Sequence, residues 1–141
     1  MQYSWGYQYV FILYEYDSNA ILAKPLKTRQ VLEINTTWSQ THLRLLHNGF
    51  SPKLHVLDNK FSLSMKKGFK KYDVAFQLVP PHVHRRNSTE RAIQTCKNHF
   101  CAGLSTCKPK SPLAQWDLLM PQAEITLTLL RSSRQYSKLS A

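Results

Sequence analysis

Hydrophobic positions along the chain switch between the two-residue spacing of strands and the three-to-four-residue spacing of helices. Residues 7–16 are rich in aromatic and β-branched side chains, which predicts a strand. Residues 17–19 carry the Asp, Ser and Asn side chains that favour turns. Residues 20–24 predict a second strand, and we expect Pro25 to end it. The chain should therefore begin with an antiparallel β-hairpin.

The segments after the hairpin alternate between helix and strand patterns. Val31, Ile34, Trp38 and Leu45 recur at near-helical spacing within residues 28–48, and Asn48-Gly49 is a helix stop. The remaining predictions are a short buried strand over residues 54–57, a basic amphipathic helix over 60–71, a strand over 74–79, and helices over 87–104 and 113–130, the last kinked or restarted at Pro121. A hairpin followed by βαβ crossovers predicts an α/β fold with a mixed sheet flanked by helices.

Composition narrows the class of protein. A chain of 141 residues suits one domain, and a hydrophobic fraction of 43% argues against wholesale disorder. No apolar run approaches the roughly 18 residues that a membrane-spanning helix needs, and no secretory signal is visible. An odd number of cysteines, 3, argues against a disulfide-stapled secreted domain. We therefore expect a protein that is neither secreted nor embedded in a membrane.

The charge points to the class of partner. Lys and Arg number 19 against 8 Asp and Glu, so the formal net charge is +11. Polyanions are the natural partners of such a chain, nucleic acid first and an anionic membrane surface second. The alternative is a solvated surface that only keeps the protein soluble. The positive charges gather in three groups: Lys60, Lys66, Lys67, Lys70 and Lys71; then Arg85, Arg86, Arg91 and Lys97, with His82 and His84; then Arg131, Arg134 and Lys138.

Two of the eight carboxylates stand where metal chemistry would place them. Asp58 follows a predicted strand, and Glu90 lies in the first turn of a predicted helix. The intervening helix, strand and loop can return the chain to the same end of the sheet. Two carboxylates beside cationic side chains suit divalent ions that bridge a phosphodiester. Capping is the alternative for both: Asp58 could cap the next helix, and Glu90 could form a capping box with Asn87.

Several stretches, taken in order, resemble one known family. Residues 14–22 followed by 25–27 resemble the second and third strands of the integrase catalytic core of long-terminal-repeat retrotransposons. Residues 57–59 resemble the stretch that holds the second acid of its Asp-Asp-Glu set. Residues 76–91 resemble the stretch leading to its glutamate, and Trp116 with the helix ending at Arg131 resembles its closing helix.

This resemblance implies a ribonuclease H-like fold and DNA strand transfer dependent on Mg²⁺ or Mn²⁺. Zinc is not expected, because Cys96, Cys101 and Cys107 lack the Cys-x-x-Cys spacing of a structural zinc site. Asp58 and Glu90 would be catalytic metal ligands. The partners would be element ends and target DNA, a homodimer would be compatible with it, and the location would be the nucleus or a cytoplasmic particle. By the same resemblance Arg85, Arg86 and Arg91 would hold DNA phosphates near the site. The clustering of positive charge adds His84, Lys97, Lys66 and Lys67 as residues expected to bind nucleic acid.

The sequence also departs from the family pattern. The first catalytic aspartate belongs to a strand before Tyr7, and residues 1–6 contain no acid. We therefore expect residues 1–141 to be a partial catalytic core without its first, central strand, and without a zinc-binding or a C-terminal DNA-binding domain. We expect it to bind metal weakly and to be impaired in strand transfer. The alternatives are a non-enzymatic basic remnant that binds nucleic acid, or the product of a decaying reading frame.

Overall fold

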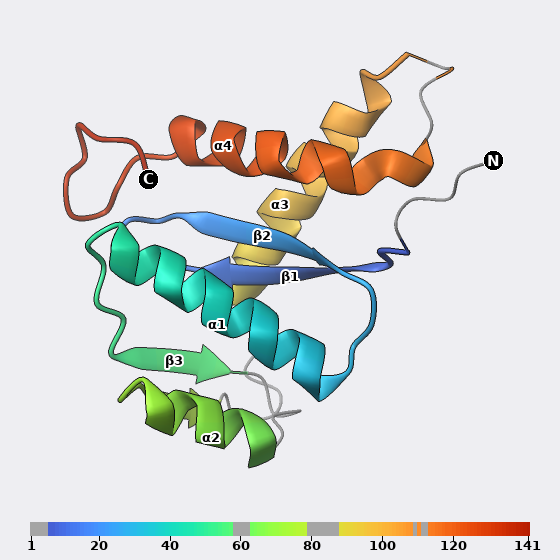
Figure 1. The fold of residues 1–141 in the computed structure, drawn as a ribbon. Helices are drawn as coiled ribbons and strands as arrows, with labels where there is room; N and C mark the ends of the chain where they lie inside the picture. The colour runs from blue at the N-terminus through green and yellow to red at the C-terminus, as the bar shows by residue number, and fades with distance from the viewer. Residues whose placement is uncertain (1–5, 58–62, 79–87, 109, 111–112) are drawn as a thin grey trace. The chain divides into compact units, whose positions relative to one another are not determined.

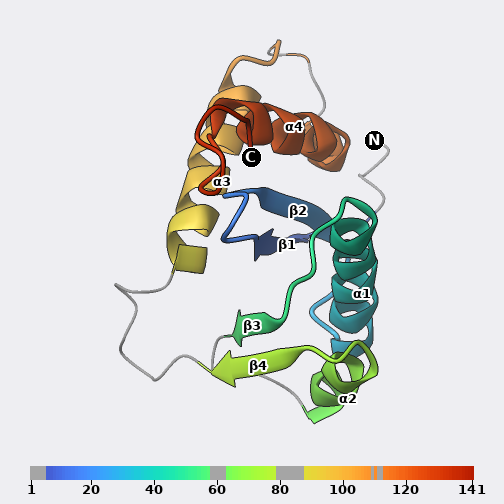
Figure 2. The same cartoon turned by 90° about the vertical axis from the view of Figure 1, so that its left-hand side faces the viewer.

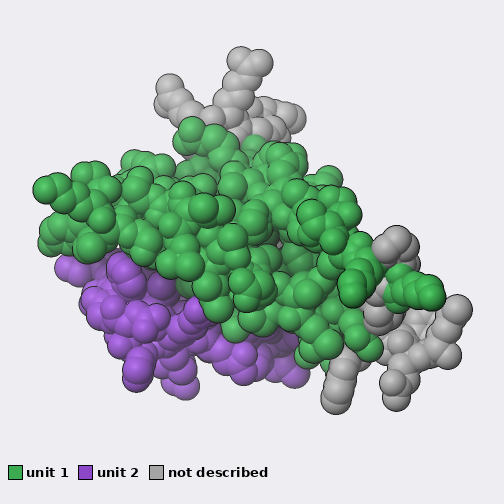
Figure 3. Space-filling view, turned by 90° about the horizontal axis from the view of Figure 1, so that it is seen from above, with its two compact units in different colours: residues 1–28, 88–141 green, residues 29–87 purple. Residues whose placement is uncertain are grey.

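The computed structural model describes residues 6–57, 63–78, 88–108, 110 and 113–141 (Figure 1). The chain divides into two compact units (Figure 3). Unit 1 combines residues 1–28 with residues 88–141, and unit 2 comprises residues 29–87. Unit 1 is therefore built from two segments that are far apart in the sequence, and each unit is described by itself.

Unit 1 contains the predicted hairpin. Strand β1 (Tyr9–Tyr14) pairs antiparallel with β2 (Ile21–Leu26). The carboxylate of Glu15 accepts hydrogen bonds from the backbone N–H groups of Asp17 and Ser18, at 3.2 and 2.6 Å. Asn19 has φ +65°, a left-handed conformation that Asn tolerates better than most residues. Turn chemistry thus closes the hairpin where the sequence predicts it.

The prediction that Pro25 ends the second strand is wrong, because Pro25 lies inside β2 opposite Val10. The backbone N–H of Glu15 donates to the carbonyl of Ala20 at 2.9 Å, which makes that facing pair a hydrogen-bonded one. Bonded and non-bonded pairs alternate along an antiparallel ladder, so the Val10–Pro25 pair is non-bonded. A proline there removes no ladder hydrogen bond, and the strand continues to Leu26.

Helix α3 (Ser88–Ser105) packs against β1, and helix α4 (Met120–Leu130) packs against β2 and α3 (Figures 1 and 2). A 3₁₀ helix, η2 (Leu113–Leu119), leads directly into α4, which has Pro121 in its first turn. The predicted restart at Pro121 is confirmed, since proline fits the start of a helix but not its interior.

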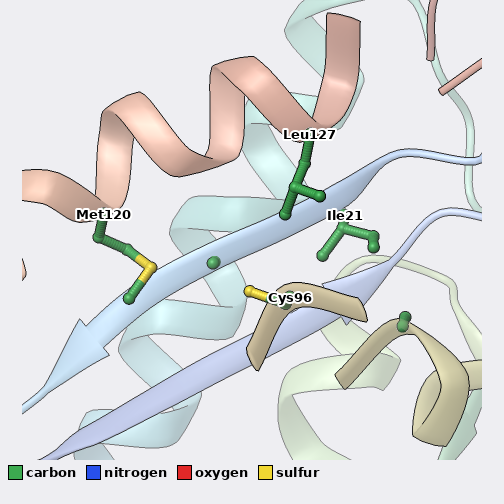
Figure 4. Close-up of a cluster of buried hydrophobic side chains, with 6 residues drawn as sticks. Ile21, Cys96, Met120 and Leu127 are labelled. Carbon is green, nitrogen blue, oxygen red and sulfur yellow. The ribbon is translucent and has the colours of Figure 1, made fainter. Parts of the chain in front are cut away.

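The core of unit 1 lies between the hairpin and these two helices. Figure 4 shows Met120 and Leu127 of α4 directed toward Ile21 of β2 and Cys96 of α3. Ile21 is fully buried, and Phe100 and Trp116 pack at the edge of the cluster. Burial of this apolar surface holds the two sequence segments of unit 1 together.

A buried carboxylate completes the contact between α4 and β2. Glu124 is 5% exposed, and its Oε2 accepts a hydrogen bond from the backbone N–H of Ala23 at 2.9 Å. By the alternation described for Pro25, this N–H points away from β1. Glu124 therefore satisfies a strand N–H that the hairpin itself leaves without a ladder partner.

Unit 2 contains helix α1 (Val31–His47), strand β3 (Leu54–Leu57), helix α2 (Leu63–Lys71) and strand β4 (Ala75–Leu78). Strands β3 and β4 pair in parallel, with Leu54 opposite Ala75 and Leu57 opposite Leu78. Trp38 and Phe69 are 3% and 1% exposed and anchor the packing of α1 on α2. The predicted βαβ crossover is thus present.

The prediction that residues 54–57 form a buried strand is wrong. Leu54 and Val56 are 53% and 49% exposed, whereas His55 and Leu57 are half-buried. Strand β3 therefore packs with one face only. An uninterrupted apolar run is typical of a strand that is buried on both faces, and the run alone does not reveal that one face of β3 is exposed.

The α/β fold class, with small sheets flanked by helices, is confirmed. Among the described residues the strands form two separate two-stranded sheets, one antiparallel and one parallel. The antiparallel pairing of β1 with β2 and the parallel pairing of β3 with β4 both agree with the predictions from the sequence. The absence of a first, central strand stays a prediction. No helix in the described part of the chain combines the length and apolar character needed to cross a bilayer.

Candidate nucleic-acid interface

The start of α3 carries two residues predicted for the site. Glu90 lies in the first turn of the helix, and Glu90 and Arg91 are both exposed. Carboxylates are favoured in the first turn of a helix, where the N-terminal end of the macrodipole is positive. An exposed carboxylate there can act as a ligand to a hard cation without first losing a packing role. Asn87, the proposed cap, lies outside the described residues.

Four predicted site residues lie outside the described part of the chain: Asp58, His84, Arg85 and Arg86. The separation of the Asp58 and Glu90 carboxylates therefore stays a prediction. Within the described ranges, no three His, Cys, Asp or Glu side chains gather as a metal site would require.

The predicted lysines belong to different units. Lys66 and Lys67 lie on α2 in unit 2, and Lys97 lies on α3 in unit 1. The ammonium of Lys66 stands 5.6 Å from the centre of the Phe76 ring, a distance at which a cation is attracted to an aromatic face. Lys67 and Lys97 are exposed.

Unit 1 has a cavity of about 230 Å³ that brings arginines from two elements together. Arg91 on α3 faces into it with Arg131 and Arg134, which follow α4 in the sequence. We call this cavity the arginine pocket. Its lining is Tyr14, Ser88, Arg91, Thr95, Arg131 and Arg134, with the buried Ala92.

The C-terminal segment is fixed to the hairpin turn, and this brings Arg131 and Arg134 to the pocket. The amide of Asn19 donates to the carbonyl of Ser132 at 3.1 Å. The backbone N–H of Arg134 donates to the carbonyl of Asp17 at 3.0 Å. These bonds span more than 110 positions in the sequence, so residues that are distant along the chain form one wall.

Sequence reasoning did not place Arg131 and Arg134 in the site, although it noted the positive group to which they belong. The missing information was the partner of the hairpin turn. Turn chemistry at residues 17–19 identifies a hairpin but does not reveal that the turn's polar groups bind the C-terminal segment. Tyr14, Ser88 and Thr95 carried no signal of their own.

Unit 2 holds a separate cluster of aromatic rings and imidazoles. Trp38 stacks on His42 at 5.1 Å between ring centres and meets His55 edge-on at 5.5 Å. Burial lowers the pKa of His42. Burial, and to a lesser degree the neighbouring His42, lowers the pKa of His55 to about 4. Both imidazoles are therefore neutral at physiological pH, as packing elements of unit 2.

The cysteines give no sign of a reactive centre. Cys96 is buried in the core of unit 1, where burial raises the pKa of its thiol and the carboxylate of Glu124 raises it further. A high pKa keeps the thiol protonated and unreactive. Cys101 is exposed and Cys107 half-buried.

Comparison with solved structures decides the fold. The catalytic core domain of BIV integrase matches with a TM-score of 0.64 at 15% identity, over 88% of this chain and 77% of that one. A chain of the simian T-cell lymphotropic virus intasome, solved in complex with PP2A regulatory subunit B56 gamma, matches with a TM-score of 0.65 at 16% identity, over 94% of this chain. The chain has the fold of a retroviral integrase catalytic core.

The integrase-core fold accounts for the order of elements but not, at 15–16% identity, for the function of single residues. The chain spans about half the length of the intasome protein, 49%. No protein-family model matches the sequence, and no curated protein matches it. The structural neighbours are integrase catalytic cores, as the sequence motifs suggested.

Proposed function

We propose that this chain is an integrase-core module of retrotransposon origin, related to metal-dependent DNA strand transfer. The similarity to integrase cores over 88% and 94% of the chain carries this proposal. A net charge of +11 supports it, because strand transfer requires that two DNA molecules be held against their phosphate repulsion. Residues 1–141 would form one integrase-core domain, acting in the nucleus or in a cytoplasmic particle, alone or as a homodimer.

In this proposal Asp58 and Glu90 hold Mg²⁺ or Mn²⁺. Carboxylate oxygens are the ligands these hard cations prefer, and the exposed position of Glu90 suits such a role. When bound, the ion would activate an attacking oxygen and stabilise a leaving one. Two carboxylates retain a cation less firmly than three, so we infer weak binding and impaired strand transfer.

The proposed role of the basic residues is to hold and orient DNA phosphates. His84, Arg85, Arg86 and Arg91 lie close to Glu90 in the sequence, and Lys97 follows on the same helix. Lys66 and Lys67 would add contacts from unit 2. Arginine and lysine do this without a metal, so the binding of DNA and of metal can be measured separately.

Metal titration tests the proposal. Isothermal titration with Mn²⁺ should give weak binding that Asp58→Asn and Glu90→Gln each abolish, because each removes one of two charged ligands. Asp73→Asn is the matched control, since Asp73 is an exposed carboxylate and Asn tolerates its left-handed backbone at φ +52°. Binding that survives Asp58→Asn, or that Asp73→Asn weakens equally, would contradict the proposed ligand set.

A second candidate function is non-enzymatic binding of nucleic acid. The arginine pocket favours it, because three guanidinium groups can hold phosphate without any carboxylate. A DNA-joining assay with Mg²⁺ separates the two. DNA joining above background that is lost in Asp58→Asn would identify an active enzyme and refute the proposed impairment. DNA binding without joining in any metal would instead support the non-enzymatic basic module.

A further inference from the structure

We propose that the arginine pocket of unit 1 is a phosphate-binding site that holds one phosphodiester group of a nucleic-acid backbone. The inference rests on the proposed function only in naming nucleic acid as the source of the phosphate. Its cavity of about 230 Å³ is below the range of drug-sized pockets and suits a small polar group. Among the residues that the structure describes, three arginines and no carboxylate line it.

Arg131 is held in place by neutral acceptors. Its Nε donates to the backbone carbonyl of Asn19 at 2.9 Å, and its terminal nitrogen donates to Asn19 Oδ1. Tyr14 donates its hydroxyl hydrogen to the same Oδ1 at 2.8 Å. Because none of these partners is negatively charged, the guanidinium is oriented while its charge stays unneutralised.

Arg134 is held by aromatic rings. Its guanidinium carbon lies 4.2 Å from the centre of the Tyr16 ring and 5.9 Å from that of Tyr14. Stacking of this kind fixes the plane of the guanidinium and leaves its N–H edge available for an oxyanion. The backbone bond from Arg134 to Asp17 fixes the same residue from its main chain.

Helix α3 supplies the opposite wall. Arg91 adds a third positive charge on an exposed side chain. Ser88 brings a hydroxyl from the first residue of the helix, where the positive end of the helix dipole favours an anion. The hydroxyl of Thr95 is already donated to the carbonyl of Arg91 at 2.8 Å.

This arrangement suits a phosphate group. Planar guanidinium groups that converge from two elements match the several oxygens of a tetrahedral oxyanion, and each can donate two N–H groups. The pocket opens at the surface of a strongly basic chain, so a phosphate that is part of a polymer can reach it without being enclosed. These features favour a backbone phosphodiester over a free ion.

The test measures DNA binding by fluorescence anisotropy, with EDTA present so that no metal contributes. The pocket variant combines Arg91→Gln with Arg134→Gln, and leaves Arg131 in place because Arg131 holds the hairpin turn. The matched control combines Lys108→Gln with Lys110→Gln, which removes the same charge from exposed positions in unit 1. Circular dichroism and thermal melting confirm that both variants are folded.

We expect the pocket variant to lose at least about tenfold in affinity for a random-sequence duplex, and the slope of log K against log salt to fall by about 1. The control should change affinity by no more than about twofold to threefold. Arg134→Lys alone, which keeps the charge but loses the planar fork, should lie between wild type and the pocket variant. Equal losses in the two double variants would overturn the pocket, because net charge alone would then explain them.

A second arm separates the two sources of phosphate. Inorganic phosphate is titrated into the wild type and the pocket variant and followed by the amide resonances of Ser88 and Ala92. Phosphate that shifts these resonances in the wild type only, and competes with DNA, supports the proposal. The nucleic-acid assignment would be overturned if the wild type bound inorganic phosphate in the pocket but the pocket variant bound DNA as tightly as the wild type. Neither arm depends on metal or strand transfer, so a failed joining assay would not contradict the proposed phosphate-binding role of the arginine pocket.

Discussion

The imidazole of His55 is packed among the aromatic rings of unit 2, and its pKa of about 4 makes the stability of this unit depend on pH. The unfolded chain takes up a proton near pH 6.5, and the folded unit does not do so until near pH 4. The contribution of His55 to stability is therefore fully present above pH 6.5 and decreases as the pH falls toward 4. We expect a loss of roughly 2 to 3 kcal/mol over this window.

Urea titrations at pH 7.5 and pH 4.5, followed by tryptophan fluorescence, measure this loss. His55→Leu should reduce the pH dependence, because it removes the imidazole whose pKa lies near 4 and leaves only the contribution of His42. His47→Gln is the control, since His47 is exposed at the end of α1. An unchanged pH dependence in His55→Leu would show that another group is responsible.

At the scale of the element, the end of α1 gives a prediction about the backbone. The N–H of Phe50 donates to the carbonyl of Leu45 and that of Gly49 to the carbonyl of Leu46, which together form a Schellman cap. Gly49 has φ +84°, and a Cβ added there would meet nothing within 4 Å. Gly49→Ala should therefore cost about 1 kcal/mol of stability through backbone strain alone.

Urea denaturation of Gly49→Ala checks this value. Gly103→Ala is the control, because Gly103 lies inside α3, does not have a positive φ, and has equally open space around its Cβ position. Alanine is the better helix former there, so the control should gain stability. A destabilised Gly103→Ala would contradict the assignment of the Gly49 effect to backbone conformation.

Local chemistry allowed most elements to be predicted. The hairpin, the Asn48-Gly49 stop and the restart at Pro121 depend on neighbours in the sequence, and all three are confirmed. The exposure of Leu54 and the passage of β2 through Pro25 depend on what lies beside a strand, which residue spacing does not encode. For the same reason the arginine pocket was missed, because the C-terminal segment that forms one wall is placed by hydrogen bonds to the distant hairpin turn.

For the whole molecule, the net charge of +11 makes a prediction about DNA affinity. Binding through phosphate contacts should weaken steeply and linearly in log salt, and should not distinguish random sequence from the ends of a candidate element. Anisotropy titrations test both expectations. Salt concentrations between about 50 and 200 mM suit them, because phosphate-mediated DNA affinity falls steeply in this range. Tighter binding to element ends than to random duplex at every salt concentration would indicate base readout and favour the enzyme over the basic module.

The division of unit 1 into two segments has a consequence for biosynthesis. The hairpin leaves the ribosome early, but α3 and α4, which cover it, come only after the whole of unit 2 has been made. At a translation rate of roughly 5 to 20 residues per second, α3 and α4 are complete only on the order of 5 to 20 seconds after the hairpin. A two-stranded hairpin alone is marginally stable in water. The nascent chain therefore exposes the apolar face of the hairpin during translation, and unit 1 can close only after the residues up to Leu130 have been synthesised.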